Sequence, residues 1–400
     1  MGGVNRPLVS VIIPTYNRIH TLPASIDSVL KQTYGNLEVI IMDDASEDGT
    51  EEYVKSIEDN RIRYRKSSTN MGPSAARNLG AELATGEYLA FQDSDDEWMP
   101  DKLEKQMELL LDEELSLVYC EFGMYRGEEL RIRVPFREIP YNQKCGDIFS
   151  YLLLYPLIST QTMVVKRDAF LQEQGFNETL KAYEDFEFTL RLSRRNRIGF
   201  VEETLVKVNS SPESVNKRFA ERIRAQFFMA REMLEPLRER DLLWEKIGII
   251  LQEAESRLCH DTFIEELTHF SNECLSGEER SNAQLFLEKI ERSKEIVLLK
   301  MDILEKLPTL KVRILKIYAE LYDSKSIWSD QQRRELERLT DIVQGCGRLF
   351  EIPAEIWDQY NRICQKLEDT HLQWTDQLFL LTDMVGLMEP LEKLIRGSLQ

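Results

Sequence analysis

The first half of the chain alternates short β-branched runs with stretches of helical periodicity. The β-branched runs lie at 9–13, 38–42, 62–65 and 88–92, and the helical stretches between them at 21–33, 49–59 and 73–84. Strands and helices that alternate at this spacing form a parallel sheet with helices on both faces. The pattern therefore predicts an α/β fold for the first half of the chain.

The pattern changes near residue 210. Strand signals stop after residue 214, and only six of the 18 glycines follow residue 210. Apolar residues then recur at helical spacing and predict roughly seven helices. Breaks between them are expected at Ser276-Gly277, Pro308, Gly345–Gly347 and Pro353. We predict two domains, an α/β domain over residues 1–213 and an all-α domain over residues 214–400.

Charge and cysteine content narrow the class of protein. The chain of 400 residues has a net charge of −19 and no basic block, which argues against nucleic acid as a partner. Its six cysteines form no CxxC pair, as is typical of reduced thiols in a cytoplasmic protein. No apolar run approaches the roughly 20 residues that a transmembrane helix needs. We expect a cytoplasmic protein without a transmembrane segment.

Polar residues follow directly after the predicted strands. The first strand ends in PTYN (14–17), the second in DDASEDGT (43–50), and the fourth in QDSDDEW (92–98), while NMGPSAARN (70–78) follows the third. The carboxyl ends of parallel strands share one edge of a sheet, and ligands bind in the crevice beyond that edge. These motifs are therefore expected to meet in space.

Each motif also has a purely structural interpretation. PTYN is compatible with a Pro-Asn turn, and Ser46 or Asp48 with a cap of the next helix. Pro73 suits the first turn of a helix. Taken singly, these interpretations are at least as good as a functional one. The convergence of two carboxylate groups and Arg77 on one edge favours a ligand site.

A nucleoside diphosphate suits such an edge. A carboxylate accepts the ring N–H of a uracil, and an aromatic ring such as that of Tyr16 stacks on the base. A divalent cation between the acidic cluster and the diphosphate relieves the repulsion of like charges. Carboxylate oxygens select Mg²⁺ or Mn²⁺ over zinc, and Arg77 adds positive charge beside the phosphates. No GxGxxG follows the first strand, so a dinucleotide-binding enzyme is disfavoured.

The combined motifs resemble those of the family 2 inverting glycosyltransferases, which have the GT-A fold. The similarity covers most of residues 8–110, through VSVIIPTYNR, DDASEDGT, NMGPSAARN and QDSDDEWMP, and resumes at AYEDFE (182–187). The resemblance implies that Pro14, Tyr16, Asp44, Asn70, Arg77, Asp93 and Asp95 bind the nucleotide-sugar, with Asp95 as the metal ligand. Asp96 is expected to be structural. Asp185 matches the catalytic base, supported by Glu184.

Asp185 also has a structural interpretation, because a carboxylate at the start of an amphipathic helix favours the positive helix end. Beside the strand-end motifs the catalytic role is preferred. A base is needed because the acceptor must lose a proton as it attacks the sugar. One departure from the family stands out. An Arg and a His are common in family members after the last strand, where Asn209 and Ser211 stand here.

These observations predict a GT-A domain, of Rossmann-like α/β class with a mostly parallel sheet, followed by a helical domain. The predicted function is metal-dependent, inverting transfer of a sugar, most simply from a UDP-sugar, to a glycan or a protein or peptide acceptor. The alternative is a nucleotide-sugar-binding scaffold that has lost catalysis, as Asn209 and Ser211 suggest. The helical half is expected to form a homo-oligomer and recognise the acceptor, at a cytoplasmic site beside a membrane assembly. A bundle that only packs on the first domain is its alternative.

Overall fold

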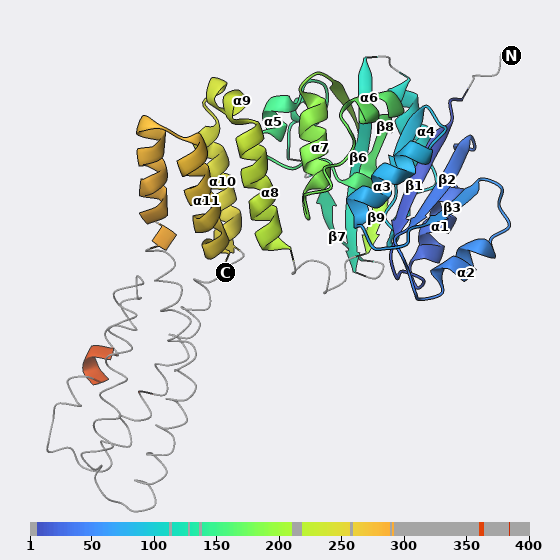
Figure 1. The fold of residues 1–400 in the computed structure, drawn as a ribbon, viewed down its shortest axis with the longest axis horizontal. Coiled ribbons are helices and arrows are strands. Elements are labelled where there is room, and N and C mark those ends of the chain that lie inside the picture. Colours follow the sequence, from blue (N-terminus) through green and yellow to red (C-terminus); the bar gives the residue numbers. More distant parts are fainter. Residues whose placement is uncertain are drawn as a thin grey trace, which may run out of the picture. The chain divides into compact units, whose positions relative to one another are not determined.

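A computed structural model gives the fold of the chain (Figure 1). It describes residues 6–111, 114–126, 129–135, 138–209, 218–256, 259–288, 290–291, 360–363 and 384. By its contacts the chain divides into two compact units, Met1–Phe270 and Ser271–Gln400. The predicted boundary at 213 falls within 210–217, outside the described residues, and the division into domains there stays a prediction.

The first unit is built on one nine-stranded sheet (Figure 1). Its strands are β1 (Val9–Thr15), β2 (Leu37–Asp43), β3 (Ile62–Lys66), β4 (Tyr88–Phe91), β5 (Asp96–Trp98), β6 (Leu115–Arg126), β7 (Glu129–Val134), β8 (Met163–Lys166) and β9 (Arg197–Asn209). The strand order is β3-β2-β1-β4-β8-β6-β9-β5, with β7 beside β6. The first four strands are parallel, and β8 joins β4 antiparallel. The α/β class predicted from the sequence is confirmed, and beyond β4 the sheet is mixed, because β8 and β5 pair antiparallel with their neighbours while β6 and β9 are parallel.

Helices pack against this sheet and follow it in the chain. They are α1 (Leu22–Leu30), α2 (Thr50–Lys55), α3 (Pro73–Leu83), α4 (Lys102–Leu110), α5 (Phe149–Leu152), α6 (Arg167–Gln172), α7 (Glu184–Ser193), α8 (Phe219–Glu232), α9 (Leu234–Glu239), α10 (Leu243–Ser256) and α11 (His260–Cys274). Short 3₁₀ helices span Tyr141–Gln143 and Thr160–Thr162. From 218 onward the described residues contain helices and no strand, as the composition predicts.

The central strands are buried along their whole length because both faces of the sheet are covered. Every residue of β1 and β2 is buried, and Val11 pairs with Val39 at the centre of the register. Helix α3 approaches β1 so closely that a Cβ at Gly80 would lie 2.6 Å from Cγ2 of Ile12. A glycine is therefore required there to seat the helix whose first turn faces the strand ends.

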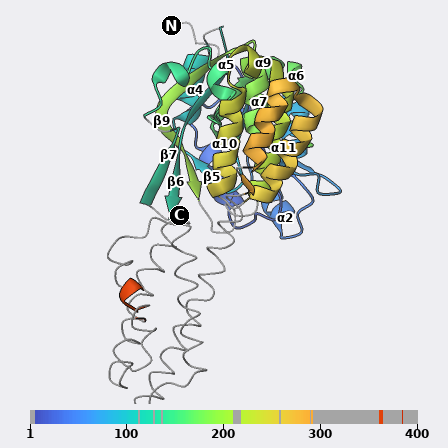
Figure 2. The same cartoon turned by 90° about the vertical axis from the view of Figure 1, so that its left-hand side faces the viewer.

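The break predicted at Ser276-Gly277 is present, because helix α11 ends at Cys274 and helical residues resume at Gly277. The breaks predicted at Pro308, Gly345–Gly347 and Pro353 lie outside the described residues. In the first unit, α8 lies beside α7 in Figure 1, and α10 lies beside α7 in Figure 2, where Nζ of Lys246 is 5.0 Å from the centre of the Phe186 ring. The helices that follow the sheet thus meet the helix that carries Asp185.

Candidate functional site

The loops after β1 and β2 are tied together by hydrogen bonds. The Asn17 N–H donates to Oγ of Ser46 across 2.9 Å, and the Ile19 N–H donates to Oδ2 of Asp48 across 2.9 Å. Oδ1 of Asp48 accepts the hydroxyl of Thr50, the first residue of α2, across 2.6 Å. Both side chains therefore shape the loops. The N-cap position of α2 is Gly49, so the predicted capping by Ser46 is wrong, whereas Asp48 accepts the N–H of Thr50 across 3.3 Å.

Asp44 connects the loop after β2 to the segment before α3. Its Oδ1 accepts the Met71 N–H and its Oδ2 the Gly72 N–H, each across 2.8 Å. The next residue, Ala45, has a φ of +68°, in the left-handed region that costs energy for a residue with a side chain. Strained backbone of this kind concentrates at functional sites, and here it follows directly after Asp44.

One cavity of about 370 Å³ is lined by the residues predicted to bind the nucleotide-sugar. Its lining includes all seven of them: Pro14, Tyr16, Asp44, Asn70, Arg77, Asp93 and Asp95. Tyr16 is 48% exposed, so its side chain is accessible to a ligand. The sequence motifs that follow four strands therefore converge at one edge, as the parallel topology requires.

Arg77 is held between two carboxylates inside this edge. Its guanidinium donates to Oδ1 of Asp93 across 2.7 Å and to Oε1 of Glu184 across 3.0 Å. The side chain is buried, so these charges interact with little screening from solvent. Arg77 thus lines the cavity, but its charge is already compensated by its two partners.

The acidic cluster after β4 divides into two roles. Asp95 lines the cavity, and burial together with the negative charge of Asp93 raises its pKa, while Oδ2 lies 3.8 Å from Arg18. Asp96 begins β5, is 4% exposed, and pairs through its backbone with Val208 of β9. Asp95 faces the cavity, whereas Asp96 belongs to the sheet.

The residues present fit a divalent cation that is completed by a ligand. Among the described residues, no group of three His, Cys, Asp or Glu side chains is placed to hold a metal alone. Mg²⁺ is typically held by one or two carboxylates together with substrate phosphates. Asp95, whose raised pKa reflects an unfavourably placed negative charge, with Asp93 nearby, provides such a partial set.

Asp185 lies in the first turn of α7, outside the lining of the cavity. Its Oδ2 accepts the Thr160 N–H across 3.1 Å, and its Oδ1 accepts the N–H of Phe186 across 2.7 Å. Burial, followed by the charge of Glu184, raises the pKa of Asp185 to about 7. A carboxylate with a pKa in this range is suited to accept a proton near neutral pH.

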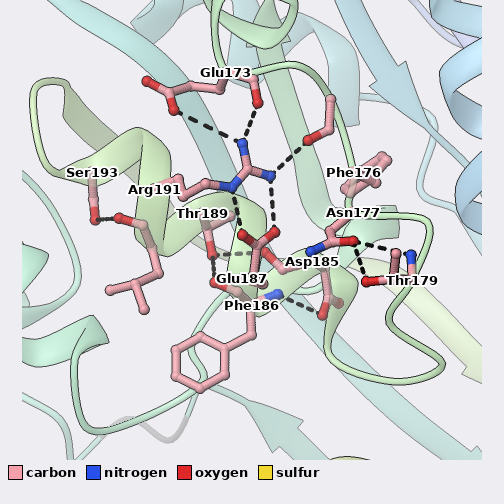
Figure 3. Close-up of polar contacts among 12 residues, drawn as sticks. Glu173, Phe176, Asn177, Thr179, Asp185, Phe186, Glu187, Thr189, Arg191 and Ser193 are labelled. Carbon is pink, nitrogen blue, oxygen red and sulfur yellow. Dashed lines mark hydrogen bonds and ion pairs between the residues drawn. The ribbon is translucent and has the colours of Figure 1, made fainter. Parts of the chain in front are cut away.

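The helix that carries Asp185 is fixed by a network around Arg191 (Figure 3). Arg191 donates to both carboxylate oxygens of Glu187 and to the carbonyl oxygens of Glu173 and Gly175. The loop that contains Gly175 is also held by Asn78 of α3, whose amide exchanges hydrogen bonds with the Phe176 backbone. Helices α3 and α7 are therefore locked through one loop, which places Arg77 beside Glu184.

Sequence comparison identifies this architecture. Residues 10–170 match the family described as glycosyl transferase family 2. These residues form a family 2 glycosyltransferase domain. The match includes the strand-end motifs around the cavity and ends before α7, so Asp185 lies beyond it.

Curated relatives agree with the family. The chain is 39% identical over 143 residues to the Escherichia coli protein WfgD, named as a UDP-Glc:α-D-GlcNAc-diphosphoundecaprenol β-1,3-glucosyltransferase. It is 40% identical over 121 residues to TuaG of Bacillus subtilis, named as a putative teichuronic acid biosynthesis glycosyltransferase. These alignments cover 35% and 30% of this chain and 56% and 48% of the relatives. The chain thus spans about half the length of these relatives.

Solved structures share the fold of the glycosyltransferase domain. Residues 1–349 of S. aureus TarS, in complex with UDP-GlcNAc, match with a TM-score of 0.56 and 21% identity, over 72% of this chain and 88% of that one. A mannosyltransferase from Pyrobaculum calidifontis, in complex with GDP-Man and Mn²⁺, matches with a TM-score of 0.50 and 18% identity, over 73% and 88%. The GT-A fold is therefore confirmed.

The helical part adds one residue to the cavity that sequence reasoning missed. Arg218, which precedes α8, lines the donor-side cavity and also an adjoining cavity of about 430 Å³ beside Glu184. Among the described residues it donates to the Lys181 carbonyl across 3.3 Å and has no carboxylate partner. The absence of the Arg and His that are common in the family is the sequence signal that could have pointed to another cation at the cavity. The side chain of Asn209 and all of Ser211 lie outside the described part of the chain.

Proposed function

We propose that this chain transfers a sugar from a UDP-sugar to a glycan acceptor, with Mg²⁺ or Mn²⁺ and with inversion at the anomeric carbon. One observation carries the proposal. A single cavity is lined by the aromatic Tyr16, by the buried carboxylate of Asp44 and by the acidic cluster after β4. Nearby, α7 carries the carboxylate of Asp185, whose pKa is raised. This combination is suited to a nucleoside diphosphate donor and to a transfer that needs a base.

The base end of the donor is assigned to Tyr16 and Asp44. The exposed ring of Tyr16 stacks on the uracil. Each oxygen of Asp44 already accepts one backbone N–H, and a carboxylate oxygen has a further lone pair for the uracil N–H. Uracil and guanine carry such a ring N–H, whereas neutral cytosine and adenine do not, which supports the donor class.

The phosphate end is assigned to Asp95, Asn70 and Arg218. Asp95 and Asp93 would hold the divalent cation together with oxygens of the diphosphate. The cation supplies Lewis-acid stabilisation of the charge on the departing diphosphate. Because Arg77 is compensated by Asp93 and Glu184, Arg218 is the residue we assign to balance the remaining phosphate charge.

Asp185 is assigned as the catalytic base. As the acceptor hydroxyl oxygen forms a bond to the anomeric carbon, its proton passes to the Asp185 carboxylate. The bond between the anomeric carbon and the diphosphate oxygen breaks, and the electron pair leaves with UDP. Attack from the face opposite the leaving group inverts the anomeric configuration. The hydrogen bonds from Thr160 and Phe186 keep the carboxylate oriented through this step.

The names of relatives support a glycan acceptor over a polypeptide. WfgD is named for a diphosphoundecaprenol-linked sugar and TuaG for teichuronic acid biosynthesis. Among the described residues no helix is both long and apolar enough to cross a bilayer. We include in the proposal a cytoplasmic site of action at the surface of a membrane assembly, where such acceptors are presented.

Binding and release of nucleotide by the wild-type protein test the proposal. Calorimetry with UDP, CDP, ADP and GDP, each with and without Mn²⁺, should show tightest binding for UDP and a gain in affinity with the metal. With a panel of UDP-sugars and Mn²⁺, the protein should release UDP slowly, because water attacks the donor in place of the acceptor. Equal binding of all four nucleotides, or no effect of the metal, would contradict the assignment of the donor site.

The scaffold alternative remains a second candidate because Asn209 and Ser211 stand where many family members carry Arg and His. It predicts that UDP binds while no sugar of the donor panel is released or transferred. Slow UDP release that depends on Asp185 separates catalysis from binding alone.

A further inference from the structure

A buried lysine in α10 has no part in the chemistry described above. Lys246 is 1% exposed and lies in a helix outside the matched family region. Burial lowers its pKa to about 7, and Glu253 on the same helix opposes that shift. A buried cation is costly unless its hydrogen bonds are satisfied, so its contacts indicate what it stabilises.

Lys246 joins three segments of the first unit. Its Nζ donates to the Leu154 carbonyl across 3.1 Å and to Oε1 of Gln226 across 3.2 Å. The same ammonium lies 5.0 Å from the centre of the Phe186 ring, within the range of a cation–π interaction. It therefore connects α10 to the segment after α5, to α8 and to α7.

Two of these segments are the ones that hold the Asp185 carboxylate. Leu154 lies in the stretch that leads to Thr160, whose N–H donates to Oδ2 of Asp185. Phe186, whose ring faces the ammonium, donates its backbone N–H to Oδ1. Lys246 thus contacts the two segments whose N–H groups donate to Asp185, without contacting Asp185 itself.

A second side chain of α10 makes a related contact. Glu253 lies two helical turns after Lys246 and forms an ion pair with Arg222 of α8 across 2.9 Å. Arg222 donates to the hydroxyl of Tyr183, whose ring centre lies 4.6 Å from the guanidinium. Tyr183 precedes α7 with a left-handed φ of +60°. Helix α10 therefore supports the start of α7 at two points.

We propose that Lys246 is a positioning residue for Asp185, and that α8 and α10 serve the catalytic geometry as well as any role in acceptor recognition. This inference rests on the proposed role of Asp185 as the base. It also means that removing everything after residue 214 would remove the support of the base together with the helical part. Such a truncation cannot separate acceptor binding from catalysis.

The test replaces Lys246 by an uncharged side chain and follows the Asp185 carboxyl group directly. The variant is Lys246→Met, and its control is Lys102→Met. Lys102 is also buried, stacks 3.8 Å from the Trp98 ring, and has no hydrogen-bond partner among the described residues. Both substitutions remove a buried ammonium, but only the first removes a link to the segments around Asp185.

The full chain, labelled with ¹³C at the aspartate carboxyl carbons, is titrated by NMR, and Asp185→Asn identifies the signal. Glu184, Arg77 and Tyr183, which face Asp185 from α7, α3 and the turn before α7, are unchanged in both variants. We expect the Asp185 titration to move about one pH unit higher in Lys246→Met, because the Thr160 and Phe186 N–H donors that favour the ionised carboxylate are then held less firmly. It should stay in place in Lys102→Met. The same titration in both variants, whether shifted or not, overturns the proposal.

Kinetics provide the second readout. With a UDP-sugar that the wild type turns over, Lys246→Met should lower kcat by about tenfold to a hundredfold while the KM for the donor stays the same. A donor KM that rises with kcat unchanged would overturn the positioning role. If Lys246→Met does not fold, Lys246→Gln, which keeps a donor for the Leu154 carbonyl, takes its place. The NMR titration needs no turnover, so failure of the proposed function and failure of this inference are distinguished.

Discussion

The backbone N–H of Thr160 donates to Oδ2 of Asp185 across 3.1 Å, from a position 25 residues earlier in the chain. This bond fixes the direction of the carboxylate without neutralising it, because a backbone N–H carries no net charge. Burial and the charge of Glu184 raise the pKa of Asp185 despite this bond. The site thus holds a proton acceptor in a fixed orientation with an affinity for protons near neutral pH.

The raised pKa makes activity and stability depend on pH in opposite directions. Transfer should fall as the pH drops below about 7, since the base must be ionised. The folded protein keeps a proton on Asp185 between about pH 4 and 7 that the unfolded chain releases, so this group lowers stability as the pH rises. Asp185→Asn should therefore have a higher Tm than wild type at pH 8, and the difference should shrink at pH 4.5. A difference that is constant across this range would contradict the raised pKa.

Arg77 should contribute more to stability than an exposed arginine does. Arg77→Met leaves Asp93 and Glu184 without their shared cation in a buried site, which should cost about 3 kcal/mol in the free energy of unfolding. Arg63→Met is the control, because Arg63 is half-exposed beside Glu38 and should cost less than about 1 kcal/mol. Urea denaturation of the three proteins measures both. Equal losses would contradict the structural role of Arg77.

Substitution of Asp95 should affect metal-dependent UDP binding, whereas substitution of Asp96 should affect stability. Asp95→Asn should remove the gain in UDP affinity that Mn²⁺ provides, because this carboxylate lines the cavity. Asp96→Asn should keep the gain and lower the Tm, because its side chain is buried where β5 joins β9. Calorimetry with UDP in the presence and absence of Mn²⁺, with a melting curve for each variant, measures both effects. Loss of the metal effect in Asp96→Asn alone would reverse the assignment.

The early strands, their parallel arrangement and the edge they share could be predicted from local sequence. Continuous apolar runs such as that of β1 specify buried parallel strands, and polar residues after them must meet at one edge. The neutralisation of Arg77 could not be predicted, because Glu184 is 107 residues away and no local pattern reports that pair. The burial of Lys246 could not be predicted either, because a lysine in an amphipathic helix normally faces solvent. Contacts between charged residues far apart in the sequence can be identified only once the fold is known.

Arg218 should strengthen the interaction with the donor phosphates. Arg218→Gln should lower kcat/KM for the UDP-sugar by about tenfold or more, since a hydrogen bond to a charged group contributes about 1.5–3 kcal/mol. The control is Arg224→Gln in α8, because Arg224 pairs with Glu221 and lies outside the lining of the cavity. The assignment fails if both variants show the same kcat/KM.

The central claim, that Asp185 makes this family 2 domain a catalyst rather than a nucleotide-binding scaffold, is tested by one comparison. The rate of UDP release from the preferred UDP-sugar is measured for wild type and Asp185→Asn in Mn²⁺ at pH 7.5, with the UDP affinity of each. Asp185→Asn should release UDP about 10²–10⁴ times more slowly and bind UDP as tightly as wild type. Equal rates of release, or UDP binding without any release in either protein, would contradict the claim.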